Sequence, residues 1–472
     1  MDLLGKTNNK GDGMKRHAIA ILLVPILIVG CHGNSIKTEE FLQDLDYYVN
    51  TIHEAHGDPF RMISEEDFDT KVKALRQYVL ERTKGKISIV ECFYYFQELA
   101  ASIQDGHTKV YFPNHSWEYL EPIFPFRLKL IEDEVYVIEK WGNDNIPKFA
   151  QIFDINQIPI ETLYEQSVKL FSTSLDHAKA LWFERKFSHL LSTYHSLKAP
   201  WKVRFGHNGK VQTGTVEGMT INVYLAKWRN IRKSQFREYS FTVDGKKIPV
   251  LEIPSYSHGS EAEYHKFIDK FFKKYKKSEY LVIDLRFNGG GNGYWGHYLL
   301  DYLTDDPFMI SKRFDFKVSD YLRDSEYAEK AGNRLTEAEN GEYLTIQSNQ
   351  MWTPKTDENK FRGKIFLLIS ERTFSAGAVT AAIFKFHQMG IIIGQETSGR
   401  EKLCSDPVTI ELPNSKLKAT IPVAIYTLPG NNPDRGVIPD IKINYSINDY
   451  KNGVDKEMGK VKELIMSNGL PN

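Results

Sequence analysis

Short apolar runs alternate with helical segments in the second half of the chain. The runs YLVIDLR (280–286) and KIFLLIS (364–370) are apolar except at or near their ends, where charged or polar residues stand. Runs of this length and character are typical of strands buried on both faces of a sheet. Because a helical segment follows each run, the alternation predicts an α/β core with helices packed against a sheet over residues 246–450.

The residues before this core show two other patterns. Residues 38–104 contain three amphipathic segments and predict a small helical subdomain. Its third helix is expected to begin at Ser88, because Glu91 follows three residues later and completes a capping box. Residues 105–245 contain short alternating strands and predict a mostly β region, with a helical stretch near 160–195.

Two further segments flank or interrupt the core. Residues 320–360 are polar with weak periodicity, which predicts an excursion over the surface. Residues 451–472 are expected to form a separate C-terminal segment.

The N-terminal residues have the pattern of an export signal. Lys15 and Arg16 precede an apolar stretch, residues 18–30, which is shorter than the roughly 20 residues that span a bilayer. The stretch ends in Ile-Val-Gly-Cys, which resembles the bacterial lipoprotein box. We therefore expect residues 1–30 to be removed and Cys31 to carry a lipid, with an ordinary cleaved signal peptide as the alternative.

The same region suggests where the natural protein begins and where it resides. Met14 directly precedes the basic residues and is the expected start. Residues 31–37 then form a linker to the lipid anchor. His32 follows the cysteine instead of the aspartate associated with inner-membrane retention, so we expect an outer-membrane anchor facing the periplasm or the cell surface.

Charge and cysteine content exclude several classes of function. Lys+Arg and Asp+Glu number 61 each, so no basic excess indicates a nucleic-acid partner. No cysteine and histidine residues have the spacing of a metal site, and no cofactor is expected. Cys92 and Cys404 are interpreted as two isolated buried thiols.

Ser375 lies where an apolar run ends and a helical segment begins. Serine is a preferred N-cap, so this residue can be a helix cap alone. The free N–H groups at a helix N-terminus also favour negative charge, and an attacking serine creates an oxyanion. The segment ERTFSAGAVTAA (371–382) therefore leaves two interpretations open, a cap and a nucleophile.

Two other motifs carry residues suited to the same chemistry. The glycines of FNGGGNG (287–293) allow positive φ or the close approach of another group, although a plain tight turn needs them too. His107 in the segment DGHT lies between a predicted helix and a predicted strand. A neutral imidazole is a suitable general base near pH 7.

The order of these motifs resembles the tail-specific, or C-terminal processing, serine peptidases, in particular their tricorn-core-like and retinoid-binding-protein-like branch. The segments that carry the resemblance are DGHT, YLVIDLRFNGGGN, KIFLLISERTFSAGAVTAA, IIIGQETSG and GVIPDIKI. The resemblance implies a peptidase core of the crotonase-like (ClpP/crotonase) type. It also implies a PDZ-like module within residues 105–245.

The resemblance assigns expected roles to four residues. Ser375 matches the nucleophile. The N–H groups of Gly290 and Ala376 match the oxyanion hole. His107 matches the general base of the tricorn-like branch.

One position departs from the pattern of the other branch, which uses a lysine as base. Arg400 occupies the expected lysine position, and an arginine stays protonated. Lys402 could replace it only with a shift in register, so His107 is the favoured base. Asp434 matches the acidic group that orients the histidine, with Asp105 and Glu396 as competitors.

These features together predict a lipid-anchored serine endopeptidase that cleaves peptides or unfolded, exported proteins. The departure at Arg400 motivates an alternative, a catalytically inactive peptide-binding lipoprotein on a peptidase fold. A non-peptidase acyl hydrolase is a further alternative. Cleavage that depends on Ser375 distinguishes the first hypothesis from the second, and turnover of esters without peptides would support the third.

Overall fold

The computed structural model of the chain describes most of the residues that follow the N-terminal segment. These are residues 34–113, 121–142, 145–231, 236–355 and 359–467. The predicted export signal and Cys31 lie outside the described residues. Within them, no helix has both the length and the apolar character needed to cross a membrane.

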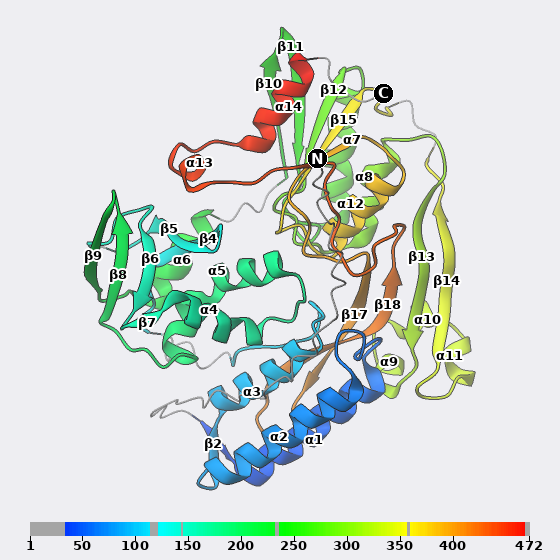
Figure 1. Ribbon diagram of the computed structural model, residues 1–472. Coiled ribbons are helices and arrows are strands. Elements are labelled where there is room, and N and C mark those ends of the chain that lie inside the picture. The colour runs from blue at the N-terminus through cyan, green and yellow to red at the C-terminus, as the bar shows by residue number, and fades with distance from the viewer. Residues whose placement is uncertain (1–33, 114–120, 143–144, 232–235, 356–358, 468–472) are drawn as a thin grey trace, which may run out of the picture.

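The described chain begins with three helices that share one hydrophobic core, and two short strands, β1 (Ser35–Lys37) and β2 (Lys86–Ser88), pair antiparallel beside them. The helices are α1 (Thr38–Ala55), α2 (Glu65–Arg82) and α3 (Ile89–Ser102), at the blue end of the chain in Figure 1. The predicted capping box at α3 is confirmed, because Ser88 accepts from the N–H of Glu91 and the Glu91 carboxylate accepts from the N–H of Ser88.

The middle region combines one antiparallel sheet with three helices. The sheet order is β4 (Phe126–Ile131), β5 (Glu134–Lys140), β6 (Gln151–Ile155), β8 (Trp201–His207) and β9 (Lys210–Val216), with β7 (Ile158–Pro159) on β6. The expected helical stretch contains α4 (Ile160–Ser167), the short 3₁₀ turn η2 (Val168–Leu170) and α5 (Asp176–Thr193). Helix α6 (Ile221–Ile231) was not expected. The PDZ-like assignment remains a prediction.

The predicted α/β core is confirmed, and a six-stranded sheet forms its centre. Its order is β10 (Arg237–Val243), β11 (Lys246–Glu252), β12 (Tyr280–Asp284), β15 (Lys364–Ile369), β16 (Ile391–Gly394) and β19 (Ile441–Lys442). The strands from β11 to β19 are parallel, and β10 pairs antiparallel at one edge.

Helices cover both faces of this sheet, as the continuous apolar runs require. Helices α7 (Glu261–Tyr275), α8 (Gly293–Asp301) and α12 (Ala376–Phe386) share one core with Ile283 and Leu367. Helix α14 (Lys456–Met466) packs on the opposite face against the alternate strand residues Val282 and Phe366. Figure 1 shows this layered arrangement, with α14 on one side of the strands and α8 and α12 on the other.

A second sheet connects the core to the N-terminal helices. Its order is β14 (Tyr343–Trp352), β13 (Phe308–Lys317), β18 (Lys418–Thr427) and β17 (Lys402–Glu411), and the short strand β3 (Lys109–Val110) also pairs with β18. The predicted surface excursion contains α9 (Asp320–Arg323), α10 (Ala328–Ala331) and α11 (Arg334–Glu337), but also β14, which was not predicted. Helix α13 (Ile447–Lys451) precedes α14.

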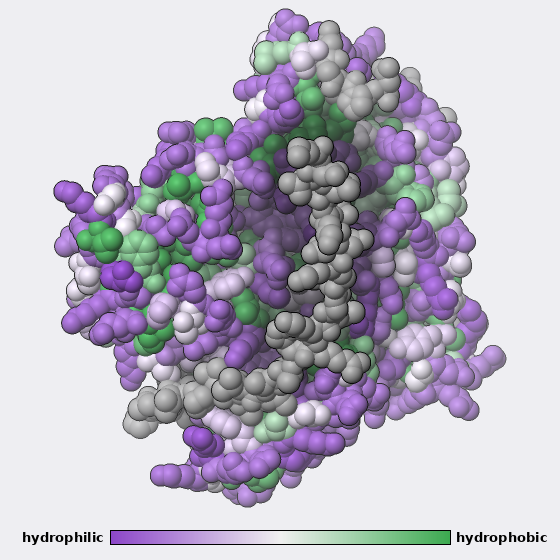
Figure 2. Space-filling model, in the orientation of Figure 1, coloured by the Kyte–Doolittle hydropathy of each residue, from purple (hydrophilic) through white to green (hydrophobic). Residues whose placement is uncertain are grey.

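Hydrophobic side chains are concentrated in these cores. On the face shown in Figure 2, polar residues predominate and hydrophobic residues occur in small separate groups. Cys92 and Cys404 are both free and buried, which confirms the interpretation as isolated thiols.

Arg286 joins the end of β12 to the start of α14. Its guanidinium group binds Asp284 through two nitrogens and also binds Asp455 and Glu457. The Arg286 and Asp284 side chains are only 13% and 1% exposed, so the pair is largely withdrawn from water.

Replacing Arg286 with leucine is expected to lower the free energy of unfolding by about 3 kcal/mol, because it leaves buried carboxylates without their cation. Denaturant titration of the variant and of the wild type measures this difference. Lys246→Met removes the cation of the exposed pair with Glu279 and is the control. An Arg286→Leu effect no larger than that of the control would contradict the structural role.

Candidate active site

Ser375 lies in a sharp turn between β15 and α12. Its backbone has φ 49° and ψ −128°, a conformation that residues other than glycine rarely adopt and that costs roughly 1–3 kcal/mol. Ser375 occupies the N-cap position of α12, but its side chain makes no capping hydrogen bond. The cap interpretation therefore accounts for the position of Ser375 but not for the direction of its hydroxyl group.

Hydrogen bonds tie this turn to the loop that follows β12. The Phe374 N–H donates to the carbonyl oxygen of Asn288 at 2.9 Å, and the Thr373 hydroxyl donates to that of Leu285 at 2.8 Å. Both loops leave the carboxyl ends of adjacent parallel strands, the edge where α/β sheets bind ligands. The sheet thus places the glycine run beside Ser375.

Gly290 is the glycine that lies against Ser375. A Cβ at this position would lie 2.7 Å from the Cβ of Ser375, and the residue has φ +100°. The expectation that its N–H is free for an oxyanion is not met, because that N–H donates to Oδ1 of Asn288 at 2.9 Å. Ala376 is the first residue of α12, so its N–H has no partner within the helix.

Gly290→Ala is expected to lower peptide cleavage on the order of 10²-fold, because the added methyl group must displace Ser375 and an error of about 1 Å costs this much. Gly289→Ala is the matched control, since a Cβ at Gly289 meets nothing within 4 Å. Steady-state kinetics of both variants, with melting curves to check folding, measure the effect. Equal activities of the two variants would contradict the proposed close approach.

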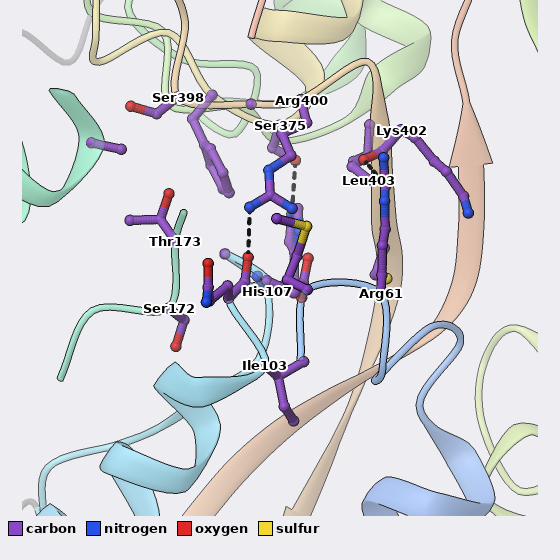
Figure 3. A pocket seen from close by; sticks show the side chains of 18 of the residues that line it. Arg61, Ile103, His107, Ser172, Thr173, Ser375, Ser398, Arg400, Lys402 and Leu403 are labelled. Atoms are coloured by element: carbon purple, nitrogen blue, oxygen red, sulfur yellow. Dashed lines mark hydrogen bonds between the residues drawn. The ribbon is translucent and has the colours of Figure 1, made fainter. Parts of the chain in front are cut away.

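His107 reaches Ser375 from a different part of the chain. Figure 3 shows the two side chains facing each other, with Nε2 of His107 3.2 Å from Oγ of Ser375. The loop of His107 leads into β3, which pairs with β18, and the Thr420 hydroxyl donates to the His107 carbonyl oxygen at 2.8 Å. The imidazole also stacks on the ring of Phe374, 5.0 Å away. These contacts hold the imidazole in place beside the hydroxyl group.

The environment of His107 favours its neutral form. Burial lowers the pKa of His107 below its ordinary value of 6.5, and the nearby charge of Asp105 offsets part of this effect. A neutral imidazole can accept the proton of a serine hydroxyl. Within the described part of the chain, the buried Nδ1 of His107 has no hydrogen-bond partner.

The three acidic residues considered for orienting His107 lie in other interactions. Asp434 binds Arg61 at 2.6 Å, and its side chain is 60% exposed. Glu396 accepts from Arg435 and from the N–H of Gly436.

Asp105 is the acidic residue nearest in the chain, but its carboxylate faces its own loop. Its Oδ2 accepts from the N–H groups of His107 and Thr108, each at 3.0 Å. Among the hydrogen bonds of the described residues, none joins a carboxylate to the imidazole of His107. The expected contact with Asp434 is thus not formed, because Arg61 binds this carboxylate instead.

Lys402 and Arg400 line the pocket that also contains Ser375 and His107, but neither forms a hydrogen bond with Oγ of Ser375. Lys402 binds the carboxylate of Asp58 at 2.8 Å. Arg400 donates to the carbonyl oxygen of Gln104 and to the hydroxyl of Ser174, and Figure 3 shows its guanidinium group in the site. The geometry therefore favours His107 over Lys402 as the base.

A histidine far away in sequence supports the DGHT loop. Nδ1 of His56 accepts from the N–H of Asp58, so Nε2 carries the proton and donates to the Thr108 hydroxyl at 2.7 Å. That hydroxyl donates to Asp105 at 2.9 Å. This series of hydrogen bonds could not be predicted from the sequence, because motif spacing does not show that residue 56 meets residue 108.

His56, Asp105 and Cys404 also lie close enough together to be considered as metal ligands, with ligand atoms within 4.8 Å of one another. Both ring nitrogens of His56 already form hydrogen bonds, and burial raises the pKa of the Cys404 thiol well above its ordinary value. A thiolate is the form that binds metal. The cluster therefore fits a hydrogen-bonded support for the loop better than a metal centre.

Comparisons with known proteins relate part of the chain to peptidases. Residues 247–443 match the family model of peptidase family S41. The chain is 28% identical over 222 residues to a tail-specific protease of Haemophilus influenzae, a match that covers 46% of this chain and 27% of that protein. The chain thus spans about a quarter of the length of this relative.

Solved structures extend the likeness in fold beyond the matched residues. Mature CPAF has a TM-score of 0.69 at 16% identity, covering 91% of this chain and 97% of that chain. Mature CPAF complexed with lactacystin has a TM-score of 0.66 at 17% identity, covering 91% and 98%. The resemblance expected from the order of the motifs is confirmed, because residues 247–443 are similar to peptidase family S41.

Proposed function

We propose that the chain is a serine endopeptidase in which Ser375 is the nucleophile and His107 the general base. The observation that carries this proposal is the 3.2 Å separation of Oγ and Nε2 at a strained turn between a strand and a helix. Catalytic serines at such turns are held with their hydroxyl groups exposed to substrate. The match to peptidase family S41 supports the same reaction class.

The proposed reaction uses residues of this chain alone. Oγ of Ser375 attacks a peptide carbonyl carbon while Nε2 of His107 accepts its proton. The N–H of Ala376 and the N-terminus of α12 stabilise the oxyanion of the tetrahedral intermediate. His107 then donates the proton to the leaving amine. In the second half of the reaction, His107 accepts a proton from a water that attacks the acyl carbon, and returns this proton to Oγ of Ser375 as the acid product leaves.

In this scheme the missing side chain of Gly290 leaves room for Ser375. The N–H of Gly290 can become a second donor to the oxyanion only when its hydrogen bond to the Asn288 side chain breaks. Asp434 does not act on the imidazole in the geometry described, so orientation of His107 rests on Phe374 and on the anchoring of β3 to β18. No cofactor or metal takes part.

The proposed substrates are peptides or unfolded proteins that have been exported from the cytoplasm. The basic and apolar N-terminal segment before Cys31 supports export and lipid attachment, and the bacterial tail-specific protease relative is consistent with a role in the cell envelope. An anchor at Cys31 would hold the domain at the outer membrane, facing the periplasm or the cell surface.

The test uses the purified chain, a peptide library and a denatured protein. Mass spectrometry of the products should show new termini at internal bonds, and a fluorophosphonate probe should label Ser375. Turnover of esters without peptides would indicate a non-peptidase acyl hydrolase. Peptide binding with neither cleavage nor labelling would support the inactive, peptide-binding alternative.

A further inference from the structure

A second cavity lies beside the catalytic pocket, with a volume of about 310 Å³. Its walls come from α3, from the segment after His107, from η2 and from α5. They include Phe93, Phe112, Leu170, Phe171, Trp182 and Leu190. We call this cavity the aromatic pocket. Every residue that lines it precedes the matched peptidase domain in sequence.

The aromatic pocket borders directly on the catalytic pocket. Gly106, Ser172 and Trp182 line both cavities, and Gly106 directly precedes His107. A peptide with a carbonyl group at Ser375 therefore has a side-chain pocket within its reach.

Hydrogen bonds within the protein hold the walls of the aromatic pocket together. The Gln97 side chain accepts from the N–H of Val110 at 2.9 Å and donates to the carbonyl oxygen of Leu170 at 2.7 Å. Gln97 thus links α3 to β3 and to η2, and its polar groups are used in doing so. An occupant meets mainly apolar surface in a pocket that is already formed.

Two lysines add charge at the border of the aromatic pocket. Nζ of Lys109 lies 5.0 Å from the centre of the Tyr111 ring, and Nζ of Lys186 lies 6.0 Å from that of the Trp182 ring. Both lysines are exposed, and no aspartate or glutamate is among the described residues that line the pocket. This combination complements an apolar group that has a carboxylate close by.

We propose that the aromatic pocket binds a large apolar side chain of the peptide substrate, and that Lys109 and Lys186 favour an acidic residue next to it. This inference rests on the proposed peptidase function. It places part of the substrate preference outside residues 247–443, in segments that the family match does not cover.

The experiment compares pairs of peptides that differ only in having phenylalanine or alanine at one position. Mass spectrometry of a cleaved library first identifies the position at which the wild type prefers a large apolar residue. Leu190→Trp, which fills the pocket, is then expected to reduce the ratio of kcat/KM for the two peptides at least about tenfold. The ratio is used because a general loss of activity affects both peptides alike.

The charge component has its own variant and control. Lys186→Glu is expected to reduce the preference for aspartate over lysine beside the apolar residue about tenfold, since it replaces an attraction by a repulsion. Lys266→Glu makes the same change on the exposed face of α7 and should leave the ratios unaltered.

The outcomes separate this inference from the proposed function. A wild type that neither cleaves peptides nor is labelled at Ser375 overturns the proposed function itself. A wild type that cleaves without preferring large apolar residues, or a folded Leu190→Trp with an unchanged ratio, overturns the pocket assignment alone. If Leu190→Trp does not fold, Phe93→Ala decides, because an enlarged pocket should shift the preference from phenylalanine towards tryptophan.

Discussion

Replacing Ser375 with alanine is expected to lower the rate of peptide cleavage by about 10⁴- to 10⁶-fold, the range found when the nucleophile of a serine peptidase is removed. The reason is that no other hydroxyl group is hydrogen-bonded to Nε2 of His107 in the described structure. Single-turnover and steady-state assays on one peptide measure the loss. Ser405→Ala, on β17 and outside the pocket lining, is the control.

A second substitution at the same position tests the strain in the turn. Ser375→Gly also removes the hydroxyl group, but glycine adopts φ 49° without the steric cost that serine and alanine bear. We therefore expect Ser375→Gly to be as inactive as Ser375→Ala and to melt at a higher temperature. Retained activity in either variant would show that another group is the nucleophile.

The strands of the core were predictable because each apolar run matches one buried strand. In β12 and β15, neighbouring residues such as Val282 and Ile283 face opposite layers of helices, so both must be apolar. In contrast, β14 escaped prediction because it is only partly buried and its polar residues show no clear period. Pairing with β13, a contact distant in sequence, makes it a strand.

The proposed nucleophile and base were predictable from motifs, but their hydrogen-bond partners were not. Ser375 and His107 were identified from residue type and order along the chain, and the structure brings them together. Asp434 occupies the expected sequence position, yet Arg61, more than 300 residues away, binds its carboxylate. Local spacing carries no information about such a competitor.

The proposed oxyanion hole was also only partly predictable. The glycine run correctly indicated close approach to another group, since a Cβ at Gly290 would lie only 2.7 Å from the Cβ of Ser375. Which N–H groups are free depends on a few backbone angles and on the Asn288 side chain, which accepts from Gly290. Residue types alone do not determine these angles.

The base assignment predicts a large effect at His107. His107→Gln is expected to lower cleavage by about 10⁴-fold or more, since an amide cannot accept the proton of Ser375. The double variant Ser375→Ala/His107→Gln should be no slower than Ser375→Ala, because the two residues act as a unit. Additive losses in the double variant would mean that His107 acts independently of Ser375.

The pH profile distinguishes His107 from a lysine as the base. Only the neutral imidazole accepts a proton, and burial holds the pKa of His107 below 6.5. Activity should therefore fall as the pH drops through this pKa and be level above about pH 7.5. A lysine base, with an ordinary pKa of about 10.4, would give a rate that still rises in the alkaline range. If kcat/KM of the wild type keeps rising beyond pH 8, and this rise is lost in Lys402→Met, the base is Lys402 and not His107.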